Sequence, residues 1–95
     1  MTKKRFTLIA RVSTDNRRAV KNALEELLAR ASITSTDEGF FVKAMMHGGS
    51  ARELNRSLLS ALRRAERKTR LRSEWKSGST TERFFDYVPK GLIQP

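Results

Sequence analysis

The chain has 95 residues, no cysteine and a formal net charge of +10, since 20 lysines and arginines stand against 10 aspartates and glutamates. This length fits a single domain, residues 1–95, whose ends at 1–4 and 90–95 we expect to be loose. The lack of cysteine excludes disulfides and cysteine chemistry, and it favours a cytoplasmic location. Solubility alone needs only about 2–8 charges in a small domain, so this excess predicts a polyanionic partner.

The first two predicted elements are a strand and a helix. Apolar and polar residues alternate over residues 6–12, which predicts a strand. Residues 13–16 then form a cluster of helix-capping residue types. Apolar residues recur at helical spacing after this cluster, so we expect a first helix near residues 15–31.

The rest of the chain carries a second helix between further strands. A short strand is predicted at residues 33–36 and a stronger one at 40–46, with a turn between them. Ser50 and Glu53 match the capping box that begins many helices, and the apolar stripe after them predicts a second helix near residues 50–69. Residues 71–76 and 81–88 are predicted as two closing strands around a turn at Gly78.

The order of these elements predicts an α+β fold. A strand, a helix, two strands, a helix and a strand, with an extra C-terminal hairpin strand, are typical of the ferredoxin-like (split βαβ) arrangement. We expect a two-layer sandwich in which two helices cover one face of an antiparallel sheet, while the other face stays open. Because many unrelated activities share this fold, it does not by itself predict a function.

Residues that could carry catalysis are few. The single histidine, His47, stands three residues before Ser50, but no third group completes a nucleophilic triad. Acidic residues match neither a metal-binding loop nor a two-carboxylate site. Gly48 and Gly49 precede a helix without the full pattern of a phosphate-binding loop. We therefore expect no enzyme activity, metal, cofactor or small-molecule substrate.

The predicted second helix carries the most specific signal. At about 100° per residue, a set of arginines lies along one line of the helix, opposite the apolar stripe, and one more arginine lies at the edge of this line. This arginine stripe consists of Arg52, Arg56, Arg63, Arg67 and Arg70. A solvated helix face usually mixes both signs of charge, because like charges repel each other there. Arginine also matches phosphate through its planar fork.

From this pattern we predict that the arginine stripe binds the phosphate backbone of nucleic acid. Replacing Arg63 and Arg67 together by alanine should keep the fold and weaken binding to all nucleic-acid sequences alike. The alternative is that the stripe is an ordinary solvated face.

The open face of the predicted sheet is the second candidate site. Alternation can place Arg11 of the first strand on the same side as Phe41 and Lys43 of the third, a combination that suits stacking of unpaired bases. The same face is also a candidate homodimer interface or second core. The aromatic residues of the closing hairpin are interpreted as core and edge packing, and they are Trp75, Phe84, Phe85 and Tyr87.

Together these features predict a small binding module without catalysis, whose partner is RNA or DNA. The main alternative is a protein-interaction or homodimerisation domain with an acidic partner. Peripheral binding to anionic lipid ranks last, because no amphipathic helix exposes large apolar residues next to its basic ones. The sequence also holds no apolar run long enough for a membrane span, and its N-terminal segment lacks the apolar stretch of a signal peptide.

Overall fold

The computed structural model describes residues 4–28 and 30–85, together with the backbone of 88–89. Within these residues the secondary-structure elements follow one another as β1 (Lys4–Ser13), α1 (Arg17–Leu27), β2 (Ser32–Ser35), β3 (Gly39–Gly48), α2 (Ala51–Ala65), β4 (Arg70–Ser77), β5 (Thr80–Phe85) and β6 (Val88–Pro89).

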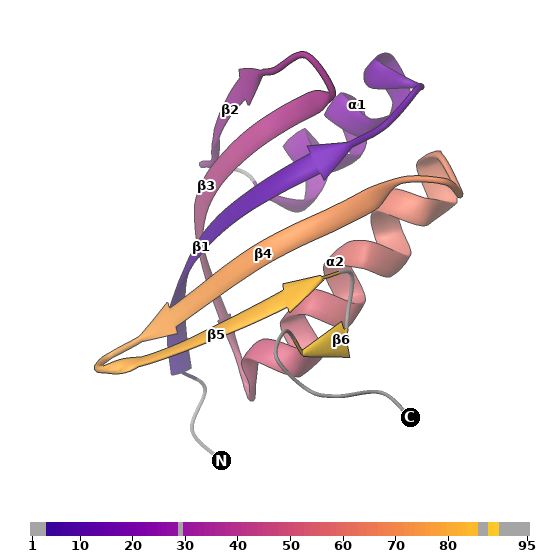
Figure 1. The fold of residues 1–95 in the computed structure, drawn as a ribbon. Coiled ribbons are helices and arrows are strands. Elements are labelled where there is room, and N and C mark those ends of the chain that lie inside the picture. The colour runs from indigo at the N-terminus through magenta and orange to yellow at the C-terminus, as the bar shows by residue number, and fades with distance from the viewer. Residues whose placement is uncertain (1–3, 29, 86–87, 90–95) are drawn as a thin grey trace.

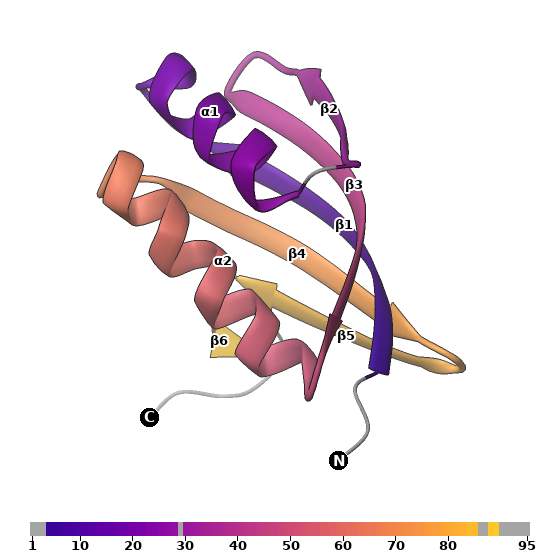
Figure 2. The ribbon, with the colours of Figure 1, turned by 180° about the vertical axis from the view of Figure 1, so that it is seen from behind.

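The strands form one antiparallel sheet in the order β2-β3-β1-β4-β5-β6. β1 lies in the middle, between β3 and β4, and the two connections that contain helices join β1 to β2 and β3 to β4. Figure 1 views the sheet with both helices behind it, and Figure 2 shows α1 and α2 in front of the sheet. The α+β class, the antiparallel sheet and the two helices on one face are thus confirmed.

Both helices end earlier than the sequence predicted. α1 ends at Leu27, and the backbone N–H of Ala31 then donates to the Leu28 carbonyl at 3.0 Å. α2 ends at Ala65, the last apolar residue of its stripe, so a longer helix would have no further apolar side chain to bury. The backbone N–H and the hydroxyl of Thr69 instead donate to the Glu66 carbonyl, at 3.0 and 2.6 Å, and close a turn.

The hydrophobic core fills the space between the sheet and the helices. On β1 every second side chain is buried, which confirms the predicted alternation. Leu24 of α1 and Leu62 of α2 are fully buried against this face, and so is Trp75 of β4. The predicted core role is therefore confirmed for Trp75 and for Phe84, which is only 2% exposed. The strand predicted over residues 81–88 ends at Phe85, and residues 86–87, including Tyr87, lie outside the described residues.

Two glycines, one at the start of a strand and one in a turn, stand where a residue with a side chain would clash or be strained. A Cβ atom on Gly39 would lie 2.0 Å from the carbonyl oxygen of Val12, so the approach of β3 to β1 at this point excludes a side chain. Gly78, in the turn between β4 and β5, has a φ of 61°, which glycine adopts without steric cost. These positions fix the start of β3 and the tight turn of the closing hairpin.

Candidate nucleic-acid interface

A row of four side chains crosses the open face of the sheet. Arg11 of β1 is paired with Phe41 of β3 on one side and with Arg72 of β4 on the other. Arg72 is paired in turn with Phe85 of β5. Directly paired residues of antiparallel strands place their side chains on the same face. We call these four residues the transverse row; its two aromatic ends are three strand spacings apart, which is about 14 Å.

Basic side chains dominate the rest of this open face. The register places one acidic residue of the described strands on it, Glu74, and the Nε of Arg83 donates to Glu74 Oε2 at 2.9 Å. Six further basic side chains share the face outside this ion pair. They are Arg5, Arg11, Lys43, Arg70, Arg72 and Lys76. The face is therefore strongly cationic, and its one acidic strand residue is already neutralised.

Each phenylalanine of the transverse row contacts two cations. The Arg11 Cζ lies 5.9 Å from the centroid of the Phe41 ring, and the Lys43 Nζ lies 5.8 Å from it. The Phe85 ring is contacted by Arg72 at 5.0 Å and by Arg70 at 5.9 Å. These are cation–π contacts, in which the charged groups lie over the rings. An aromatic ring flanked by cations offers a stacking surface for a base and a partner for the adjacent phosphate.

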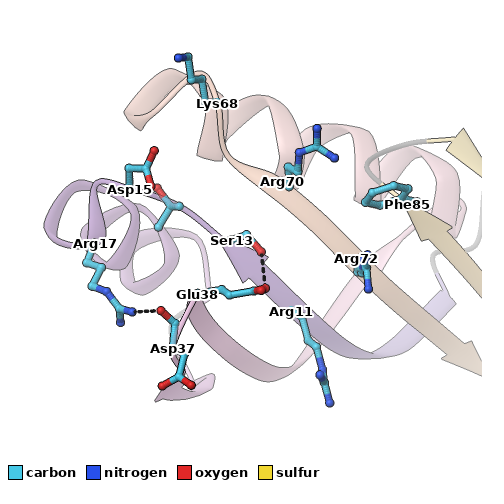
Figure 3. Close-up of a pocket in the computed structure, with 11 residues that line it drawn as sticks. Arg11, Ser13, Asp15, Arg17, Asp37, Glu38, Lys68, Arg70, Arg72 and Phe85 are labelled. Atoms are coloured by element: carbon cyan, nitrogen blue, oxygen red, sulfur yellow. Dashed lines mark hydrogen bonds between the residues drawn. The ribbon is translucent and has the colours of Figure 1, made fainter.

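An open groove of about 510 Å³ lies between the two phenylalanines of the row. Ile9, with 36% of its surface exposed, contributes to its floor. A second hollow, which we call the end cleft, has a volume of about 640 Å³ and lies where β1 leads into α1 (Figure 3). The groove and the end cleft share Arg11, Arg72 and Phe85, so they form one continuous surface.

Arg17 also lines the end cleft, but the fold already uses its guanidinium group. Its two terminal nitrogens donate to the carbonyl oxygens of Thr36 at 2.7 Å, Asp37 at 2.8 Å and Gly39 at 3.3 Å. These bonds attach the start of α1 to the turn between β2 and β3. Arg17 therefore positions one wall of the cleft instead of offering a free cation to a ligand.

The arginine stripe predicted on the second helix is not a single helix face. Because α2 ends at Ala65, Arg67 lies in the turn that follows. Arg70 lies on β4, where it contacts Phe85. Arg63 is half-buried, and its Nε donates to the Thr69 carbonyl at 3.1 Å. The premise that these arginines share one exposed line is therefore wrong.

The structure separates the remaining predicted site residues into two groups. Arg52 and Arg56 are exposed on α2, in the helical layer, and their part in binding stays a prediction. Arg11, Lys43 and Phe41 lie together on the open face, as the alternation predicted, and both cations contact the ring. The sheet face therefore gathers more of the predicted site than the helix does.

Two members of the transverse row were missed by the sequence analysis. Arg72 was not among the residues predicted to bind, and Phe85 was interpreted as packing, whereas it is exposed on the open face. The alternation of Leu71 and Trp75 on β4 places Arg72 on the other side of the sheet. Phe84 and Phe85 are neighbours on one strand, so only one of them can face the core.

No family model, curated protein or solved structure matches this chain. Among the described residues, no three histidine, aspartate or glutamate side chains gather as a metal site. The described helices include none that is both long enough and apolar enough to cross a bilayer.

Proposed function

We propose that this chain is a nucleic-acid-binding module that holds an unpaired strand across the open face of its sheet. The observation that carries the proposal is the transverse row, in which two aromatic ends enclose Arg11 and Arg72. Phe41 and Phe85 would stack on bases, and the surrounding cations would neutralise phosphates. The charge of +10 agrees with a polyanionic partner.

An unpaired strand suits this surface better than a duplex does. The faces of the bases in a duplex are stacked on one another, so a duplex could use the cations but not the two phenylalanine rings. An acidic protein is the second candidate partner, and it too would use the cations. It would not require two rings about 14 Å apart, each in cation–π contact with basic side chains. We therefore favour single-stranded nucleic acid.

A homodimer through the open face is disfavoured by charge. In a two-fold interface the same patch meets itself, so the basic side chains of one copy would face those of the other. Juxtaposed like charges cost several kcal/mol in an interface. The one acidic strand residue on this face, Glu74, is already bound to Arg83. The homodimer expected as an alternative would therefore need a different surface.

We further propose that the fold is ferredoxin-like and that the module has no catalytic activity. The strand order β2-β3-β1-β4, with a helix in each of the two crossover connections, supports the first proposal. For the second, the hydroxyl of Ser50 accepts the backbone N–H of Glu53 at 3.2 Å and so serves as a helix cap. His47 is exposed on β3, and within the described part of the chain no hydrogen bond joins it to a serine or threonine hydroxyl.

The proposed function can be tested by replacing both rings of the row with leucine. Binding of the wild type and of the Phe41→Leu/Phe85→Leu double variant to single-stranded and double-stranded RNA and DNA 12-mers is measured by fluorescence anisotropy at low salt. Leucine keeps apolar volume but removes the stacking surface. Because stacking contributes about 1–3 kcal/mol per base, the variant should bind single strands about 10-fold or more weakly. Its binding to duplexes should change little.

The matched control is Met45→Ala, which removes another exposed apolar side chain from β3. Met45 is 55% exposed and lies outside the transverse row, so this variant should bind single strands like the wild type. Circular dichroism of all three proteins checks that the fold is kept. Unchanged binding by the leucine variant would exclude the row as the site. A wild type that binds no single strand at low salt would refute the proposed function and favour an acidic protein partner.

A further inference from the structure

Three acidic residues, Asp15, Asp37 and Glu38, line the end cleft together with its cations. Glu38, in the turn between β2 and β3, extends over the end of β1 toward the side that carries Arg70 and Arg72 (Figure 3). Its Oε1 accepts the hydroxyl of Ser13 at 3.4 Å. Its backbone carbonyl accepts the N–H of Thr14 at 3.0 Å, which fixes the turn against the loop after β1. Glu38 is thus held by one hydrogen bond of its carboxylate and one of its backbone carbonyl.

A negative charge at this place opposes phosphate binding. Among the described residues, Glu38 forms no ion pair with Arg11, Arg70 or Arg72, although all four line the same cleft. In a surface that serves only to attract phosphates, such a carboxylate would lower the affinity. Its position is instead suited to the groups of a nucleotide that donate hydrogen bonds. In RNA those groups are the ribose 2′-hydroxyl and the N–H groups on the edges of the bases, and only the base edges differ from one nucleotide to the next.

The bases differ in what they offer to a carboxylate, which only accepts hydrogen bonds. Guanine presents two adjacent donors on its Watson–Crick edge, the ring N1–H and the 2-amino group, and these match the two oxygens of one carboxylate. Uracil presents one N–H between two carbonyl oxygens, which would repel the second carboxylate oxygen. Adenine and cytosine each present one amino group beside a ring nitrogen that accepts. Only guanine therefore forms two parallel bonds to a carboxylate.

Resting on the proposed function, we infer that the end cleft is a guanine-selective subsite in which Glu38 reads the base. The volume of about 640 Å³ is sufficient for a nucleotide, and the cleft continues into the groove through Arg11, Arg72 and Phe85. A strand held on the transverse row can therefore reach the cleft. Arg70, on the wall of the cleft, lies where it can neutralise the adjoining phosphate.

The test compares three RNA nonamers that differ only at the central position. Eight positions are uridine, and the centre is uridine, guanosine or inosine, the last being a guanosine that lacks the 2-amino group. Because a bidentate pair discriminates by about 1–3 kcal/mol, wild-type protein should bind the guanosine nonamer at least about five-fold more tightly than the uridine nonamer. Inosine, which keeps one of the two donors, should lose most of this preference.

Two variants separate recognition from the general effect of charge. Glu38→Gln offers one donor and one acceptor and can pair with uracil as well as guanine, so the guanosine preference should fall to within about two-fold. Asp37→Asn removes the same charge one residue earlier, from a side chain that points away from Glu38 in Figure 3, and should keep the preference. Both variants should bind the uridine nonamer at least as tightly as the wild type does.

The outcomes distinguish this inference from the proposed function. If the wild type binds the uridine and guanosine nonamers equally, the guanine subsite is refuted and the proposed function stands. If the guanosine preference persists in Glu38→Gln, another group reads the base and the assignment to Glu38 is wrong. If no nonamer binds at low salt, the proposed function fails, and the subsite fails with it.

Discussion

At the scale of single residues, a buried polar side chain provides the hydrogen-bond acceptor for the indole of a buried tryptophan. Asn55 is fully buried on α2, and its Oδ1 accepts the indole Nε1–H of Trp75 at 3.0 Å and the hydroxyl of Ser73. The same indole N–H also lies 3.1 Å from the Ser73 hydroxyl oxygen. These groups satisfy each other away from water, so α2 and β4 are joined by polar contacts as well as by apolar packing.

Removal of the Asn55 side chain should therefore destabilise the fold more than an ordinary helix substitution. Asn55→Ala withdraws an acceptor from two buried donors and should lower the free energy of unfolding by about 2 kcal/mol. Ser57→Ala, at an exposed position of the same helix, should change it by less than about 0.5 kcal/mol. Urea denaturation followed by circular dichroism gives both values. Equal stability of the two variants would show that the buried polar contacts contribute nothing.

Only part of this buried contact between α2 and β4 could be predicted from the sequence. The alternation on β4 allowed Trp75 to be assigned to the core, because that inference needs only neighbouring residues. Its partner Asn55 is 20 positions away in the chain, and no local pattern indicates which helical residue meets the indole. For the same reason, the pairing of Arg72 with Phe85 could not be predicted until the strand register was known.

At the scale of elements, local patterns predicted the starts of the helices better than their ends. The hydroxyl of Ser50 accepts the N–H of Glu53, so the capping sequence located the start of α2 correctly. The end of α2 depends on a competing turn in which Thr69 donates to Glu66, and the arginine spacing gave no sign of it. Because of this earlier end, Arg70 lies on β4 and on the open face of the sheet, and it does not continue the line of arginines on α2.

Arg63 is consequently expected to stabilise the fold, with no direct part in binding. Its Nε donates to the Thr69 carbonyl at 3.1 Å and so attaches the end of α2 to the chain that enters β4. Arg63→Ala should lower the free energy of unfolding by about 1 kcal/mol and leave single-strand affinity within about two-fold of the wild type at temperatures where both are folded. Denaturation and anisotropy measure the two quantities. A large loss of affinity with unchanged stability would restore the helix as the binding site.

At the scale of the whole molecule, the core and the proposed binding surface lie on opposite faces of the sheet. The helices and the inner face of the sheet bury the apolar residues, and this leaves the outer face of the sheet free to carry charge and two partly exposed rings. The free arginines of the helical layer, including Arg52 and Arg56, add to the long-range field of the molecule. Both arginines belong to α2, which packs on the face of the sheet opposite to the transverse row; Figure 2 shows this helix in front of the sheet.

The salt dependence of binding distinguishes direct phosphate contacts from this general field. For a single strand, the slope of log K against log salt is about −0.7 per phosphate neutralised, so contact with about four phosphates gives a slope near −3. Arg11→Ala/Arg72→Ala removes two cations of the row and should reduce the magnitude of the slope by about 1.4. Arg52→Ala/Arg56→Ala removes the same charge from the helical layer and should leave the slope nearly unchanged.

Titration of anisotropy between 50 and 300 mM salt, about the range over which such affinities fall steeply, measures these slopes. Equal reductions in the two double variants would mean that the strand responds to the field of the whole molecule and not to the row. A reduction confined to the helix variant would place the strand on α2. A reduction confined to the sheet variant would place two phosphates beside Arg11 and Arg72, between the two rings, which is the position that stacking on Phe41 and Phe85 requires.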